Sequence, residues 1–79
     1  MLTGPQIRAA RALLNWSGED LAKKIGLARH TIMNLEKSDG VPPSRTQTLL
    51  DIKTAFEGAG IEFIGTPENG AGVRFKIKA

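Results

Sequence analysis

The sequence predicts one mostly α-helical domain, residues 1–79, in which four helices are followed by a small C-terminal two-stranded β element. Two observations support this fold class. Up to about residue 58, apolar residues recur at the three- and four-residue intervals of amphipathic helices, and capping residues precede the helical runs. From residue 61 onward, apolar and polar residues alternate, which is the pattern of half-buried strands.

The first helix is expected to begin directly after Thr3. Thr3 and Gln6 have the spacing of a capping box, in which each side chain binds the main-chain amide of the other residue. Pro5 is tolerated in a first helical turn. The apolar residues of this segment share one helical face and are expected to be buried: Ile7, Ala10 and Leu14, with Leu13 beside them.

The second and third helices are expected to run from about Gly18 to Ile25 and from about Arg29 to Lys37. Ser17 and Asp20 predict a second capping box at the start of this pair. Gly26 stands where a helix ends with a residue of positive φ, so the chain is expected to turn sharply there. The two helices are therefore expected to be held close together.

The third helix combines an apolar face with a polar one. Ile32 and Leu35 are expected to point inward, whereas the other faces carry Arg29, His30, Thr31, Met33 and Asn34. Arg29 can donate two hydrogen bonds to guanine, and Asn34 can pair with adenine in the same bidentate way. The large apolar side chains of this and other segments are interpreted as core or subunit contacts: Leu13, Leu14, Trp16, Met33 and Phe56.

Three ordered patterns in this helix pair resemble the Cro/C1-type (XRE-like) helix-turn-helix family of small bacterial or phage transcriptional regulators. They are Ser-x-x-Asp-Leu-Ala at residues 17–22, Ile-Gly-Leu at residues 25–27 and Thr-Ile-x-x-Leu-Glu at residues 31–36. The resemblance covers about the first three quarters of the chain. It implies a four-helix, lambda-repressor-like DNA-binding core over about residues 3–58.

The resemblance also implies roles for individual residues. Bases are expected to be contacted from the third helix by Ala28, Arg29, His30 and Asn34. Arg11 and Glu36 correspond to an ion pair between the first helix and the end of the third, the alternative being two separate solvent-facing charges. The DNA phosphates are expected to meet a further set: Arg8, Ser17, Thr31, Lys37, Ser44 and Arg45.

Two positions depart from the family pattern. Gly18 stands where relatives often carry a Gln that bonds phosphate, and Ala28 stands where they carry a Ser or Thr. Glu19 and Asp20 add negative charge close to the first of these positions. Both departures are expected to weaken contacts with DNA.

A fourth helix is expected from about Arg45 to Glu57, opened by a third capping box formed by Ser44 and Gln47. Beyond it, about residues 61–78 are expected to form a β-hairpin or two strands of an intersubunit sheet. A two-stranded hairpin is marginally stable alone, so its apolar face must be covered. The residues of that face are expected to form the dimer contact: Ile61, Phe63, Val73, Phe75 and Ile77.

Composition excludes several classes of function. A chain of 79 residues with one His and no Cys offers no arrangement of catalytic side chains, so no enzymatic activity is expected. A single His without Cys is a poor metal site, and no metal or other cofactor is expected. No apolar run approaches the length of a membrane span and no secretory signal is recognisable, so the chain is expected in the cytoplasm.

The sequence-based hypothesis is a sequence-specific transcriptional regulator that binds double-stranded DNA as a homodimer and acts by occupying its operator. The net charge of +3 is compatible with a polyanionic partner. Two alternatives stay open. The chain is either a DNA-binding antitoxin or immunity component that grips a protein partner, or a protein-interaction module that has lost DNA binding.

Overall fold

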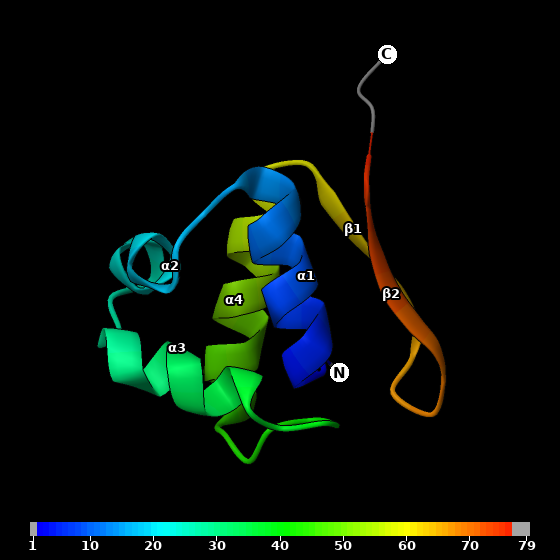
Figure 1. Ribbon diagram of the computed structural model, residues 1–79, viewed down its shortest axis with the longest axis horizontal. Helices are drawn as coiled ribbons and strands as arrows, with labels where there is room; N and C mark the ends of the chain where they lie inside the picture. The colour runs from blue at the N-terminus through cyan, green and yellow to red at the C-terminus, as the bar shows by residue number, and fades with distance from the viewer. Residues whose placement is uncertain (1, 77–79) are drawn as a thin grey trace.

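The computed structural model describes residues 2–76, and within that range it contains four helices followed by a two-stranded antiparallel sheet (Figure 1). The expectation of a mostly α-helical chain with a small β-hairpin is confirmed. The elements in chain order are α1 (Gly4–Leu14), α2 (Gly18–Ile25), α3 (Arg29–Glu36), α4 (Thr46–Gly58), β1 (Ile61–Thr66) and β2 (Asn69–Phe75). None of these helices has the combination of length and apolarity that crossing a membrane requires.

The first two capping boxes form as the sequence predicts. The amide of Gln6 donates to Thr3 Oγ1 at 3.2 Å, and the amide of Thr3 donates to Gln6 Oε1 at 2.9 Å. Ser17 and Asp20 exchange the equivalent bonds at 3.0 and 2.8 Å. Gly26 ends α2 with φ of 74°, a conformation that favours glycine, so the predicted turn is confirmed.

The predicted capping box at the start of α4 is wrong. The residue that precedes the helix is Arg45, whose side chain makes no capping hydrogen bond. Gln47 is therefore only the second residue of the helix, one position too early to pair with a cap. Its side-chain amide instead donates to Asp51 Oδ1 at 2.8 Å, one helical turn further on.

The hydrophobic core draws on all four helices and on β1. Phe56 of α4 is fully buried and stacks on Trp16 with ring centroids 5.4 Å apart, while Phe63 meets it edge-on at 5.9 Å. Leu13 and Met33 were expected in the core or a subunit contact, yet each is 40% exposed in the single chain. The apolar contacts around Phe56 thus join the hairpin to the helices, while Met33 stays at the surface.

The two strands of the hairpin extend closer to its turn than the alternating pattern predicts. The strands include parts of the glycine-rich segment 65–72, which interrupts the alternation in the sequence, and leave only Pro67 and Glu68 between them. This pairing depends on Gly65, which has φ of 76° and lies so close to β2 that a Cβ atom would sit 2.1 Å from the carbonyl oxygen of Gly70. Glycine therefore permits an irregular register that alternation alone does not encode.

The two strands pair within one chain, and β2 packs along α1 (Figure 1). Gln6 ties them together, because its side-chain amide donates to the carbonyl oxygens of Gly72 at 3.0 Å and Ile64 at 3.5 Å. The residues of the apolar face expected to make the dimer contact differ in exposure, even between the cross-strand partners Ile61 and Phe75. The members of this face range from buried Ile61 through half-buried Phe63 and Val73 to Phe75, which is 48% exposed, and Ile77 lies outside the described residues.

Candidate nucleic-acid interface

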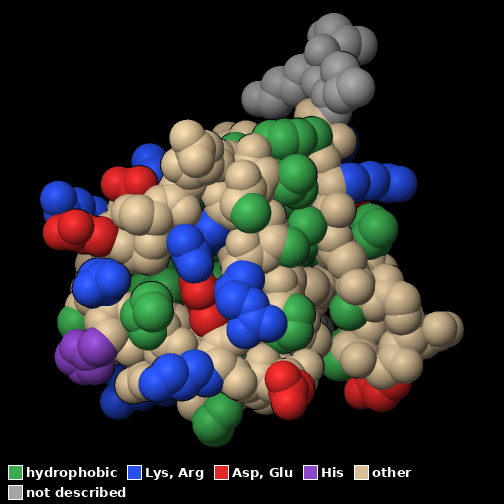
Figure 2. Space-filling model, viewed as in Figure 1, with side chains coloured by type: hydrophobic (Ala, Val, Ile, Leu, Met, Phe, Trp, Pro, Cys, Tyr) green, Lys and Arg blue, Asp and Glu red, His purple; other side chains and the backbone are tan. Residues whose placement is uncertain are grey.

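The outer surface of α3 gathers most of the side chains expected to contact bases. Ile32 and Leu35 are buried, which turns the opposite side of this helix toward solvent. A shallow open depression on that side is lined by five exposed residues, Arg29, His30, Met33, Asn34 and Lys37. In Figure 2 the histidine and several basic side chains lie over the region where Figure 1 places α3.

The N-terminal end of α3 is open. Ala28 precedes the helix and is exposed, and it has no side-chain oxygen with which to bind the first amides. Amide groups at such an end carry partial positive charge and need an acceptor from outside the helix. Because Ala28 has no capping oxygen, main-chain donors beside Arg29 and His30 are left without a side-chain partner.

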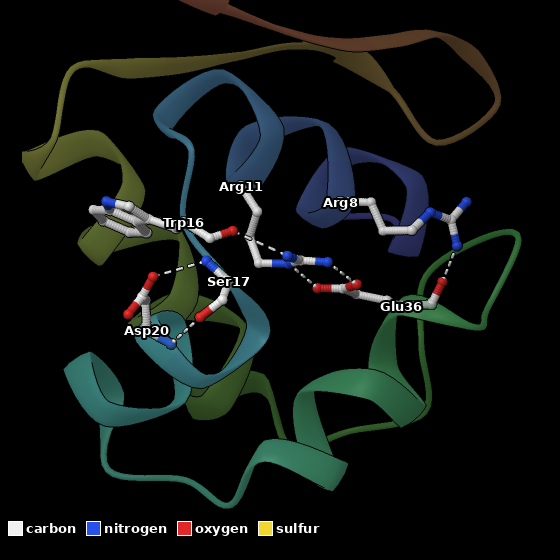
Figure 3. Close-up of polar contacts among 6 residues, drawn as sticks. All are labelled: Arg8, Arg11, Trp16, Ser17, Asp20 and Glu36. Atoms are coloured by element: carbon white, nitrogen blue, oxygen red, sulfur yellow. Dashed lines mark hydrogen bonds and ion pairs between the residues drawn. The ribbon is translucent and has the colours of Figure 1, made fainter.

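The opposite end of α3 is fixed to α1 by a bidentate ion pair (Figure 3). Arg11 Nε and Nη2 donate to the two carboxylate oxygens of Glu36 at 2.6 and 2.7 Å. Arg11 Nη1 also donates to the main-chain oxygen of Trp16 at 3.0 Å. The hydrogen bond to Glu36 raises the pKa of Arg11, although partial burial acts in the opposite direction. The pair expected from the family resemblance is therefore present, with the Glu36 side chain only 5% exposed.

Two further residues of α1 secure the same end of α3. Arg8 Nη1 donates to the main-chain oxygen of Glu36 (Figure 3). The amide of Gly4 donates to the carbonyl oxygen of Gly40 at 3.1 Å, and three carbonyl oxygens of residues 35–38 lie against the Gly4 Cα. Arg8, a phosphate candidate, thus uses part of its guanidinium to cap α3, while its other donors remain at an exposed position.

The other phosphate candidates lie on several elements. Ser17 is exposed and its hydroxyl oxygen already accepts the capping bond of α2. Thr31 is half-buried on α3. The remaining three are exposed at or after the end of α3: Lys37, Ser44 and Arg45. Their positions leave these side chains accessible to a polyanion without rearrangement of the fold.

The start of α2 carries negative charge. Hydrogen bonds from the main chain and the side chain of Ser17 lower the pKa of Asp20, so its carboxylate is charged at neutral pH. Glu19 lies beside it and faces Lys23 Nζ at 3.9 Å in an exposed pair. Gly18 adds no side chain, and a Cβ atom built there would meet only Met33 Sδ, at 3.6 Å. This part of the surface is less suited to phosphate than the end of α3.

Comparison with known proteins identifies no family for this chain, since no family model and no curated protein matches it. What the chain binds must therefore be inferred from its own surface. The helical period placed Met33 with the outward residues of α3, but its apolar chemistry led to its interpretation as a core or subunit contact. Sequence reasoning also gave no sign of the Gln6 bonds to the hairpin, which span more than fifty residues.

Proposed function

We propose that this chain is a helix-turn-helix transcriptional regulator that binds specific DNA sequences through α3 and acts, as a homodimer, by occupying its operator. The observation that supports the proposal most is the outer face of α3. Arg29, His30 and Asn34 all line one open depression on an otherwise well-anchored helix. A helix of this kind fits the major groove, where each base pair presents a distinct pattern of donors and acceptors.

The anchoring of α3 suits base recognition. The bidentate pair between Arg11 and Glu36 fixes the helix relative to α1, and Gly26 fixes it relative to α2. A rigid helix presents its side chains in a constant register, so that an arginine and an asparagine meet defined base edges. Lys37, Ser44 and Arg45 lie after the helix and supply contacts to the backbone phosphates.

A titration of the chain with bulk duplex DNA at low salt tests the DNA-binding part of the proposal. Neutralising phosphates releases counterions, so binding must be measurable even when the operator is unknown and must weaken steeply as salt is added. A fluorescence anisotropy titration at several salt concentrations measures both effects. Absence of binding at the lowest salt concentration contradicts the proposal.

Replacing Arg29 with Ala is expected to reduce affinity for a selected binding site by about 1 to 3 kcal/mol while changing affinity for random DNA little, because a base-edge contact carries the discrimination. Replacing Arg45 with Ala provides the matched control. It is expected to weaken binding to both DNAs alike and to reduce the salt slope by about one. Equal behaviour of the two variants on both DNAs would show that α3 does not read bases.

A protein-interaction module is the second candidate, favoured by the acidic start of α2 and by Gly18. Replacing Gly18 with Gln distinguishes the two. The site has room for a side chain, and the amide of a Gln can donate to phosphate, so a DNA-binding chain is expected to gain about ten-fold in affinity. Gly18→Ala, which adds a Cβ atom but no amide, is expected to gain much less in the same titration. A Gly18→Gln variant that still ignores DNA supports the interaction module.

Dimerisation through the hairpin is tested at Phe75. This residue is 48% exposed, and Leu50 on α4 is 46% exposed, which makes it a matched control. Phe75→Glu is expected to yield monomers in sedimentation experiments and to lower affinity for a duplex with two half-sites about 100-fold, with little effect on one half-site. Leu50→Glu is expected to remain dimeric. A Phe75→Glu chain that stays dimeric would move the contact to the helices.

A further inference from the structure

Met33 is an apolar side chain in the middle of a polar surface. It lines the depression on α3 together with Arg29, His30, Asn34 and Lys37, and 40% of it is exposed. Among the described residues, the other large exposed apolar side chains lie away from this depression, on α1, α4, β2 and the loop before α4. Met33 therefore differs from them in standing between candidate base-reading residues.

The neighbouring helix leaves Met33 uncovered. Gly18, the first residue of α2, has no side chain, and the Met33 Sδ lies 3.6 Å from the position that a Cβ atom would take there. Any larger residue at position 18 would shield part of the thioether. The α2 main chain thus supports one side of Met33 while the remainder of the side chain faces outward with α3.

A methionine on this surface has few possible partners in DNA. Its thioether carries no hydrogen-bond donor and is only a weak acceptor, so it cannot read the polar groups of the base edges. The major-groove edge presents one apolar group, which is the C5 methyl of thymine. Contact between these two removes apolar surface from water, and burial of one methyl group is worth about a four-fold change in binding.

We propose that Met33 is a specificity-determining residue that contacts the C5 methyl of a thymine in each half-site. This inference rests on the proposed function, because it requires α3 to enter the major groove. The contact makes binding depend on a methyl group of the DNA, which the hydrogen bonds of Arg29 and Asn34 do not detect. The half-site must contain a thymine next to the bases that those two side chains read.

The test uses a duplex enriched from a random library by the wild-type chain, and a series of the same duplex in which each thymine in turn is replaced with uracil. Uracil retains the hydrogen-bonding groups and lacks only the methyl. At one position, uracil is expected to weaken binding of the wild-type chain about three- to five-fold. Met33→Ala is expected to bind both forms of that duplex equally, and Met33→Leu, of similar volume, is expected to retain the preference.

Thermal melts establish that the Met33 variants are folded, as expected for a side chain with this exposure. Two results overturn the inference while leaving DNA recognition intact: no uracil position weakens wild-type binding, or the same position weakens wild-type and Met33→Ala binding equally. Failure of the wild-type chain to enrich any duplex overturns the proposed function itself, and the assignment of Met33 with it. Failure of the Met33 inference and failure of the proposed function therefore give different experimental results.

Discussion

Replacing Arg11 with Met, or Glu36 with Leu, is expected to cost about 3 to 5 kcal/mol of unfolding free energy, and the double variant should recover much of that loss. Each single change leaves one charge of a bidentate pair without its partner in a largely buried place. The double change removes both charges and leaves a difference in packing alone. Chemical denaturation of the four chains measures the coupling.

The two single variants should differ in severity. Arg11→Met strands a carboxylate that is 5% exposed, whereas Glu36→Leu strands a guanidinium that is 20% exposed and still bonded to the carbonyl oxygen of Trp16. Arg11→Met is therefore expected to lose more stability. Arg74→Met is the control, since its cross-strand pair with Glu62 is exposed and should contribute less than about 1 kcal/mol. Additive losses at Arg11 and Glu36 would show that their pairing contributes no coupling energy.

Replacing Gly4 with Ala is expected to destabilise the chain by about 2 to 3 kcal/mol. The added Cβ atom would sit 2.2 Å from the main-chain oxygen of Ser38 and 2.9 Å from those of Leu35 and Glu36. Main-chain atoms cannot swing away as a flexible side chain does, so α1 must separate from the end of α3. Thermal or chemical denaturation gives the loss, and it should be accompanied by weaker DNA binding if α3 is the recognition helix.

Gly58 provides the matched control for Gly4. It lies in the last turn of α4, and a Cβ atom there meets nothing within 4 Å. Alanine should therefore be tolerated, with a gain of about 0.4 to 1 kcal/mol from the reduced freedom of the unfolded chain. Equal effects of the two substitutions would mean that the contact between Gly4 and the residues after α3 is loose.

Local signals account for the parts of the fold that the sequence predicts well. A capping box involves residues three apart, so Thr3 with Gln6 and Ser17 with Asp20 identify two helix starts directly. The prediction for the start of α4 was wrong. Ser44 and Gln47 have the same spacing, but the helix begins one residue later than a capping box at Ser44 requires. A sequence pattern alone does not distinguish a used cap from an unused one.

Long-range contacts account for most of what sequence reasoning missed. Gln6 was recognised for its bond to Thr3, yet the same side chain holds the hairpin through Gly72, sixty-six residues away. Gly4 belongs to no recognisable sequence pattern, yet the main-chain oxygens of residues 35, 36 and 38 lie close to it in the fold. Neither requirement leaves a local pattern, because each arises from the distance between two main-chain segments in the folded chain.

The residues of the candidate interface that helical periodicity alone turns outward could be predicted from the sequence. The 3.6-residue period places Arg29, His30 and Asn34 away from Ile32 and Leu35, and these positions are exposed as expected. Met33 was assigned to the core or a subunit contact because of its chemistry. Its exposure beside Gly18 depends on how α2 crosses α3, which the sequence does not specify.

The fastening of α3 at one end has a consequence for its motion. Gly4, Arg8 and Arg11 follow one face of α1 and all hold the C-terminal end of α3, whereas the N-terminal end has no side-chain cap. Amide hydrogens near Glu36 should therefore exchange with solvent more slowly than those near Ala28. The last turn of α3 is expected to move with α1 as one body, so any tilt of α3 against a bound surface must carry α1 with it.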